Sequence, residues 1–291
     1  MAKTFEALSR TDKEKGNESL FPPEFSESPG NKPPLEAKRD DLRREFPPPA
    51  AGHPELDLSP NPVEEYPHQG TPLAPRKLMK FKETSLTVEE YRKMKYKIFN
   101  NGSDKPIKTI LFCGSQRGEG NSTVCLNFAQ TLAAQGYRVL LVDADLRNPT
   151  LHRMFPFEQK EGLTDLCLGR TSLENGTKTT ILDNLSVITS GMPYSNPSAI
   201  FESEAFDALL DQMKFHADCI LFDSPPLDSG GDSAALAAKV DGVVLVVQSE
   251  KTRREVAHKS KQRLEKTGAH ILGVVLNKRR FHIPNWLYRR L

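Results

Sequence analysis

Short apolar runs alternate with amphipathic segments along the chain from residue 108 onward. The runs are strand-sized and predict strands at residues 108–113, 138–143, 184–189, 218–223, 242–248 and 270–276. The intervening segments predict helices at residues 121–135, 162–169, 198–214, 232–239 and 252–267, and one more helix at 89–99 precedes the first strand.

This alternation predicts an α/β domain with a mostly parallel sheet and helices on both faces. The strand at 138–143 is apolar almost throughout, which is typical of a strand covered on both sides. The chain has 291 residues with 37% apolar content, enough for one domain of about 200 residues with a full core. We place this domain at residues 83–278.

Residues 1–82 have a different composition, dense in Pro, Glu, Lys and Ser. Of 22 prolines, 14 fall before residue 76. Such a segment buries too little apolar surface to offset the entropy of ordering it, so we predict a disordered tail. The tail either binds a partner or is a solvated spacer. A second tail, basic and aromatic, is predicted at residues 279–291.

Charge and hydropathy narrow the class of protein. The net charge is only +2, which gives no reason to expect nucleic-acid binding. The chain has neither an apolar run long enough to span a membrane nor the apolar core of a signal peptide at its start. The cysteines lack metal-type spacing and are expected to be buried free thiols: Cys113, Cys125, Cys167 and Cys219. These features predict a cytoplasmic protein without a membrane span of its own.

A glycine loop joins the first strand to the helix at 121–135. Gly118 and Gly120 allow the backbone N–H groups to point inward, and the positive end of the helix dipole favours an anion. The loop departs from the usual G-x-x-x-x-G-K-[ST] pattern, because Ser115 replaces the first glycine and Asn121 the lysine. It indicates a phosphate-binding loop of the P-loop NTPase type, with a simple glycine-rich turn as the alternative.

Acidic residues end two of the predicted strands. Asp143 and Asp145 follow the second strand, and Asp223 ends the strand at 218–223. The carboxyl ends of parallel strands, next to a phosphate loop, are where α/β folds place metal-binding and catalytic groups. Carboxylates there suit a magnesium ion or its water shell. The alternative is an aspartate-rich turn that ends at Pro149.

Several separated motifs occur together along the chain. The principal motifs are Gly118-Glu119-Gly120-x-Ser122-Thr123, Val142-Asp143-Ala144-Asp145-Leu146-Arg147-x-Pro149 and Phe222-Asp223-x-Pro225-Pro226. Shorter ones are Gly162-Leu163-x-Asp165, Asn196-Pro197-Ser198, 241–247 and 272–277. As a set they resemble the bacterial tyrosine kinases of capsule and exopolysaccharide synthesis, P-loop ATPases with a deviant Walker A motif. The resemblance covers roughly residues 86–278.

The resemblance implies ATP-dependent phosphorylation of tyrosine with ATP and Mg²⁺ as cofactors. It implies that the backbone of Gly118, Glu119, Gly120, Asn121, Ser122 and Thr123 cradles the ATP phosphates. Magnesium would be held by Ser122, Asp143 and Asp223, while Asp143 and Asp145 would accept the proton of the tyrosine hydroxyl. Asn121 brings no charge to the phosphates, and Arg117 beside the loop would compensate in part or remain a solvated arginine.

The resemblance also implies partners. A membrane-anchored regulator of polysaccharide chain length would recruit the protein to the inner face of the membrane and activate it. Glu89-x-x-Arg92-x-x-Lys95 resembles the Glu-x-x-Arg-x-x-Arg motif of self-association in this family, which predicts a homo-oligomer; the alternative is an ordinary charged helix face. The family usually ends in a cluster of tyrosines, whereas this chain offers Tyr288 as a candidate phosphate acceptor.

Two other functions stay open at the level of sequence. Asn121 and the missing tyrosine cluster favour a catalytically degenerate, nucleotide-binding scaffold of the same system. An ATPase of the positioning or partitioning type is disfavoured, because the segment from Asp143 to Pro149 and the helix at Glu89 look like those of the kinases.

Overall fold

The structure is a computed structural model that describes residues 86–100, 105–155, 157, 161–194 and 196–279. The predicted tail at 1–82 lies outside the described residues, as does all of the tail at 279–291 except Arg279. Both tails therefore remain predictions.

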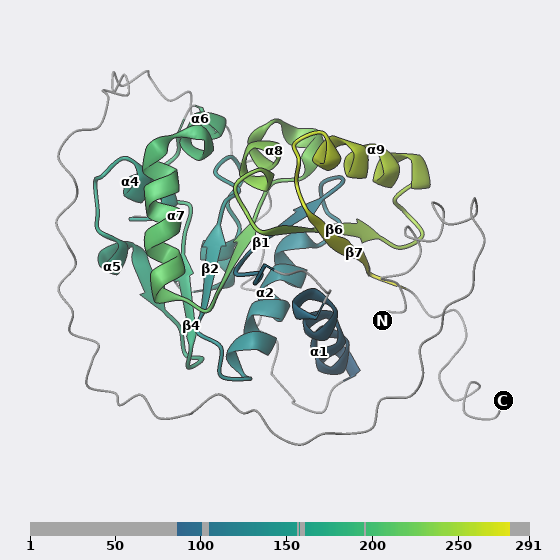
Figure 1. The fold of residues 1–291 in the computed structure, drawn as a ribbon, viewed down its shortest axis with the longest axis horizontal. Helices are drawn as coiled ribbons and strands as arrows, with labels where there is room; N and C mark the ends of the chain where they lie inside the picture. The colour runs from purple at the N-terminus through teal and green to yellow at the C-terminus, as the bar shows by residue number, and fades with distance from the viewer. Residues whose placement is uncertain (1–85, 101–104, 156, 158–160, 195, 280–291) are drawn as a thin grey trace. The chain divides into compact units, whose positions relative to one another are not determined.

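A single sheet organises the described residues (Figure 1). Its seven strands lie in the order β3-β4-β2-β5-β1-β6-β7. They are β1 (Thr109–Gly114), β2 (Val139–Asp143), β3 (Thr177–Thr179), β4 (Leu185–Ile188), β5 (Cys219–Asp223), β6 (Gly242–Gln248) and β7 (Ile271–Asn277). All neighbouring pairs are parallel except β3 and β4. The α/β fold with a mostly parallel sheet is thus confirmed.

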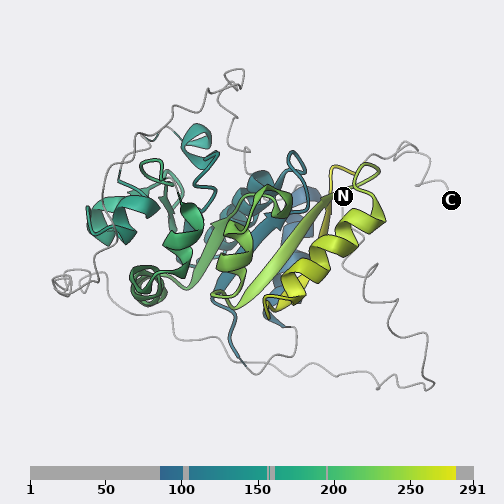
Figure 2. The same ribbon diagram turned by 90° about the horizontal axis from the view of Figure 1, so that it is seen from above.

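Helices connect the strands and cover both faces of the sheet. They are α1 (Leu86–Phe99), α2 (Asn121–Ala133), α3 (Leu151–Met154), α4 (Leu163–Cys167), α5 (Leu173–Gly176), α6 (Pro197–Glu202), α7 (Glu204–His216), α8 (Asp232–Ala237) and α9 (Arg254–Glu265), with a short 3₁₀ turn at Leu227–Ser229. Apolar residues of α1, α2 and α3 pack on one face, and those of α4, α6, α7, α8 and α9 pack on the other. Figure 2 shows α9 on the face of the sheet opposite α1 and α2.

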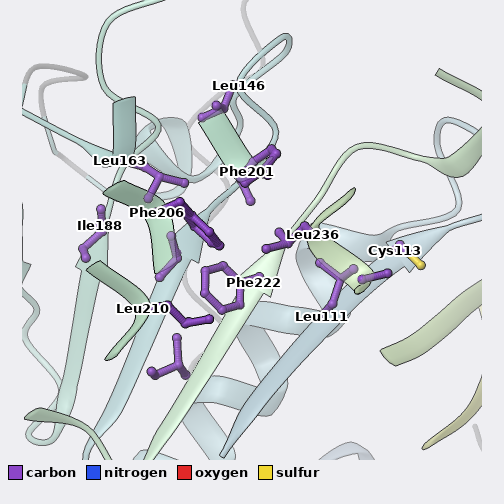
Figure 3. Packing of buried hydrophobic residues seen from close by; sticks show 14 of the residues in the cluster. Leu111, Cys113, Leu146, Leu163, Ile188, Phe201, Phe206, Leu210, Phe222 and Leu236 are labelled. Atoms are coloured by element: carbon purple, nitrogen blue, oxygen red, sulfur yellow. The ribbon is translucent and has the colours of Figure 1, made fainter. Parts of the chain in front are cut away.

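Aromatic side chains join the second face of the sheet to its helices (Figure 3). The ring of Phe206 in α7 lies 5.4 Å from that of Phe201 in α6 and 6.3 Å from that of Phe222 in β5, measured between centroids. All three side chains are fully buried, and burial of each stabilises the fold by roughly 1.5–3 kcal/mol. This packing holds β5 in place against α6 and α7, and therefore fixes the position of its last residue, Asp223.

One predicted element differs from the structure, and the short elements α3, α5 and β3 were not predicted. The helix expected at 198–214 is two helices, α6 and α7, because Ser203 has extended backbone dihedrals and its hydroxyl caps α7 by accepting from the N–H of Phe206. The antiparallel strand β3 was not predicted, because three residues flanked by polar turns carry too little pattern to detect. Neither difference changes the strands that carry the glycine loop and the acidic residues.

Candidate functional site

The glycine loop occupies residues 115–120, between the end of β1 and the start of α2. Gly118 and Gly120 have φ values of 87° and 92°, in the left-handed region where side chains are strained. A Cβ added at Gly120 would also lie 2.4 Å from the Asn277 Nδ2 atom. Both glycines are therefore required by the loop, which turns into the N-terminus of a helix of 13 residues.

The side chain of Glu119 stabilises the loop from within. Its Oε2 atom accepts hydrogen bonds from the N–H groups of Ser115 at 2.6 Å and Gln116 at 3.0 Å, and its Oε1 atom accepts one from the Thr252 hydroxyl at 2.5 Å. The carboxylate is buried. Glu119 can therefore serve a phosphate only through its main chain, while its side chain ties the loop to the segment after β6.

Asn277, the last residue of β7, and Lys278 directly after it also hold the loop, and the sequence pattern gave neither of them a role. Asn277 donates from Nδ2 to the carbonyl of Glu119 at 2.8 Å, and Lys278 donates from Nζ to the carbonyl of Gly118 at 2.5 Å. The only signal in the sequence was a polar pair directly after the last apolar strand. That signal does not reveal which loop the pair touches.

Asp143 and Asp223 lie directly opposite each other, because they are register partners at the ends of the neighbouring strands β2 and β5. Both are buried. Burial raises the pKa of Asp143 to about 7, and burial together with the charge of Asp143 raises the pKa of Asp223 well above its usual value. Two adjacent carboxylates of this kind favour binding of a cation.

Asp145 lies two residues beyond Asp143 and is less buried. Its Oδ1 atom accepts a hydrogen bond from the N–H of Asn148 at 2.9 Å. Burial raises the pKa of Asp145 to about 6, and the positive charge of Arg117 acts in the opposite direction. The exposed guanidinium of Arg117 lies 3.4 Å from the Asn148 Oδ1 atom, so Arg117 stands on the acidic side of the loop.

Asn121 stands at the lysine position of the loop and faces the sheet. Its Nδ2 atom lies 2.7 Å from Asp223 Oδ1, 3.0 Å from the carbonyl of Phe112 and 3.1 Å from the carbonyl of Ser224. Its buried Oδ1 atom has no hydrogen-bond partner among the described residues. The amide nitrogen is therefore engaged with the ends of β1 and β5, and the buried acidic pair receives a neutral donor where the usual pattern has a cation.

The predicted magnesium ligands are brought together. A hydrogen bond joins the hydroxyl of Ser122, in the first turn of α2, to Asp223. The donor set of Ser122, Asp143 and Asp223 consists of oxygen atoms, which suits Mg²⁺. No group of three or more His, Cys, Asp or Glu side chains that would hold a metal by themselves occurs among the described residues. An ion held by these residues would take one or two carboxylates and complete its shell with phosphate and water.

Comparison with known proteins agrees with this geometry. Residues 106–288 match the ParA family model, described as NUBPL iron-transfer P-loop NTPase. The tyrosine-protein kinase YwqD of Bacillus subtilis is 36% identical, over 66% of this chain and 81% of YwqD. The tyrosine-protein kinase CpsD of Streptococcus pneumoniae is 34% identical, over 60% of this chain and 78% of CpsD. The chain belongs to the bacterial tyrosine kinases within the ParA-type P-loop NTPases.

Solved structures support the same assignment. The chimerical protein CapA2B2 superposes with a TM-score of 0.66 at 32% identity, covering 69% of this chain and 88% of the chimera. The kinase domain of the Escherichia coli tyrosine kinase ETK superposes with a TM-score of 0.63 at 26% identity, covering 68% of this chain and 78% of that domain. The resemblance to the tyrosine kinases is thus confirmed, and relatives named as tyrosine kinases do not favour the degenerate scaffold.

The tyrosine-kinase motif around Asp145 is held by an ion pair that sequence reasoning did not identify. Arg147 donates to the buried carboxylate of Asp232 from Nε at 2.6 Å and from Nη2 at 3.2 Å, and the hydroxyl of Ser198 donates to the same carboxylate at 2.5 Å. Asp232 begins α8 and Ser198 lies in α6. The network joins three segments that are far apart in the sequence, and it fixes the backbone next to Asp145.

The motif predicted for self-association lies on α1. Arg92 and Glu89 form an exposed pair with 3.6 Å between Nη1 and Oε2. Lys95 instead contacts its own chain, because its Nζ atom donates to Gln135 Oε1 at 2.6 Å and lies 4.9 Å from the centroid of the Tyr137 ring. Glu89 and Arg92 therefore remain available for another copy, whereas Lys95 helps to fix α1 against the end of α2.

The remaining expectations concern cysteines and membranes. All four cysteines are buried free thiols, as predicted, and burial raises the pKa of Cys113 and Cys167 to about 12. Among the described residues, none of the helices has the length and apolar character needed to cross a membrane.

Proposed function

We propose that this protein is an ATP-dependent protein-tyrosine kinase that acts on itself or on a partner in capsule or exopolysaccharide synthesis. The observation that carries the proposal is the register pair Asp143 and Asp223, placed beside the glycine loop and Ser122. The relatives are named tyrosine-protein kinases, which supports the same reaction for this chain.

The N–H groups of residues 118–123 and the dipole of α2 would bind the phosphates of ATP. Ser122, Asp143 and Asp223 would hold Mg²⁺, which supplies positive charge to the transferring phosphate. Arg117 adds the positive charge that we assign to the loop itself. The reaction needs mainly correct positioning and neutralised charge, and the rigid ends of β1, β2 and β5 supply the positioning.

Asp145 is the residue that we propose as the acceptor of the tyrosine proton. It follows the end of β2, retains solvent exposure, and has a pKa near 6 because of burial. At neutral pH such a carboxylate is ionised and still a useful base. Asp143 is fully buried and accepts from the N–H groups of Thr150 and Leu151, so it suits the metal better than the substrate.

Incubation of the full chain with ATP and Mg²⁺, followed by mass spectrometry of phosphotyrosine, tests the proposal. The same mixture with EDTA is the control. We expect modified tyrosines only with Mg²⁺, with Tyr288 among the candidates. Calorimetry with Mg²⁺·ADP completes the test. Nucleotide binding without phosphotyrosine, even with the cytoplasmic part of the membrane regulator added, would instead support the scaffold.

We further propose that the kinase acts at the inner face of the membrane, activated by a membrane-anchored regulator of chain length, and that it self-associates through α1. Exposed ion pairs contribute only about 0–1 kcal/mol, so Glu89 and Arg92 can exchange their mutual contact for contacts with a second copy at little cost.

Reversal of charge at Arg92 is expected to weaken self-association. Arg92→Glu places two carboxylates next to each other on α1 and should raise the dissociation constant of the oligomer by about tenfold or more, as measured by sedimentation velocity. Lys93→Glu is a matched control, because Lys93 is also exposed and pairs with Glu90 on an adjoining stripe of the same helix. Equal effects of the two variants, or a monomeric wild type, would contradict an oligomer built on Glu89 and Arg92.

A further inference from the structure

Thr150 touches every residue that we assign to magnesium. Its N–H donates to Asp143 Oδ2 at 3.0 Å. Its hydroxyl lies 3.1 Å from Ser122 Oγ and 3.4 Å from Asp223 Oδ2. One residue thus contacts α2, the end of β2 and the end of β5, although it belongs to none of these elements.

The orientation of the Thr150 hydroxyl is unusual for its position. Thr150 is the N-cap residue of α3, and a threonine there normally uses its hydroxyl to accept from the first N–H groups of the helix. Here the side chain makes no capping bond, and Asp143 accepts from the N–H groups of Thr150 and Leu151 instead. The hydroxyl is turned away from its own helix and toward the acidic pair.

The hydrogen bonds of Ser122 show what this orientation does. A serine hydroxyl has one proton and two lone pairs. The Thr150 hydroxyl has one proton, and its shorter contact, 3.1 Å to Ser122 against 3.4 Å to Asp223, assigns that proton to Ser122, whose own hydroxyl donates to the Asp223 carboxylate. One lone pair of the Ser122 oxygen accepts from Thr150, and the Ser122 proton points to Asp223. A single lone pair therefore remains, and its direction is fixed. A ligand oxygen oriented in this way is prepared for a metal ion.

The burial of these four residues indicates that an ion reaches the acidic pair from the side on which the hydroxyl groups of Thr150 and Ser122 lie. Asp143 and Asp223 are buried, whereas Thr150 and Ser122 are only partly buried. An ion that approaches the acidic pair from solvent therefore meets the two hydroxyl groups. An aliphatic residue at position 150 would preserve the packing and the N–H bond to Asp143, and would remove the contacts of the hydroxyl with Ser122 and Asp223.

We propose that Thr150 is a positioning residue of the magnesium site, which orients the Ser122 hydroxyl toward the ion through its own hydroxyl. The inference rests on the proposed function, because it assumes that Ser122, Asp143 and Asp223 hold Mg²⁺. Its effect is on the affinity for the metal, and it leaves the contacts of the glycine loop with the nucleotide unchanged.

The test compares four proteins by electron paramagnetic resonance of Mn²⁺, used in place of Mg²⁺, in the complex of the full chain with ADP. Thr150→Val is expected to weaken Mn²⁺ binding by about tenfold, the typical effect of one hydrogen bond to a ligand. Thr150→Ser keeps the hydroxyl and should bind Mn²⁺ within about twofold of wild type. Thr177→Val is the matched control, because the Thr177 hydroxyl donates to the carbonyl of Leu173 at the far edge of the sheet.

Thermal unfolding and ADP binding in EDTA identify variants with a folding defect. If Thr150→Val does not fold, Thr150→Ala is a second variant that lacks the hydroxyl. Equal Mn²⁺ affinity of wild type and Thr150→Val, with ADP bound, would overturn this inference alone. Equal weakening in Thr150→Ser would also overturn it, because the hydroxyl would not be the cause. Failure of the wild type to bind both ADP and Mn²⁺ would refute the proposed function as well.

Discussion

Asp145→Asn is expected to lower the rate of phosphotyrosine formation by about 10²–10⁴-fold, the usual contribution of a general base. Asparagine keeps the oxygen that accepts from the N–H of Asn148, so the turn after β2 is preserved. It cannot accept the tyrosine proton. Quantitative mass spectrometry of phosphotyrosine over time, with saturating Mg²⁺·ATP, measures the loss.

The control is Asp183→Asn, the same chemical change at an exposed aspartate in the turn before β4. It should leave the rate unchanged, and both variants should bind Mg²⁺·ADP within a few-fold of wild type. Retention of the wild-type rate in Asp145→Asn would mean that another group accepts the proton. Loss of ADP binding would instead assign Asp145 to the nucleotide.

The pH dependence gives a second measure of the same role. Because burial raises the pKa of Asp145 to about 6, the carboxyl group is protonated below that pH and ionised above it. The rate in wild type should therefore rise with pH through about 6, and the residual rate of Asp145→Asn should lack this rise. The same rise in both proteins would place the titrating group elsewhere.

The sequence predicted the sheet and the place of the acidic residues, because both follow from local pattern. Continuous apolar runs can form buried parallel strands, and the carboxyl ends of such strands share one edge. Asp143 and Asp223 had to meet once β2 and β5 were neighbours. That adjacency itself is not local, since β5 is the fifth strand in the sequence and lies between β1 and β2.

The contacts that complete the site could not be predicted from sequence. Thr150, Asp232 and Asn277 are ordinary polar residues in the sequence, and each acquires its role from a partner far away along the chain. Single polar residues near turns are usually solvated, so pattern alone gives no reason to select them. Their side chains become informative only when tertiary structure shows which of them are buried and which atoms they face.

Asn121 shows the same limit within a motif that the sequence did identify. The replacement of the lysine by Asn121 was evident from the sequence. The resemblance implied that the main chain of Asn121 contacts the phosphates. The sequence did not show which atoms the side-chain amide of Asn121 contacts. The structure directs Nδ2 to the carbonyls of Phe112 and Ser224 and to the carboxylate of Asp223. The substitution therefore acts on the acidic pair as well as on the charge available to the phosphates.

Asn121→Lys is expected to tighten the binding of Mg²⁺·ADP by about ten- to a hundredfold, because a charge-assisted contact is worth roughly 1.5–3 kcal/mol. An ammonium group carries three N–H donors, so lysine can donate to the phosphates and still satisfy two of the three oxygen atoms that the amide now contacts. Its charge should lower the pKa values of the neighbouring aspartates. Isothermal titration calorimetry with ADP, with and without Mg²⁺, measures the change.

Asn121→Gln separates charge from length, because glutamine extends the side chain and remains neutral. It should leave the affinity for Mg²⁺·ADP within about threefold of wild type or weaken it, since it loses the fitted contact with Asp223 at 2.7 Å. Equal tightening by lysine and glutamine would mean that the length of the side chain, and not its charge, causes the higher affinity. Unchanged affinity in Asn121→Lys would show that the phosphates do not bind beside position 121, and the glycine loop would then need another ligand.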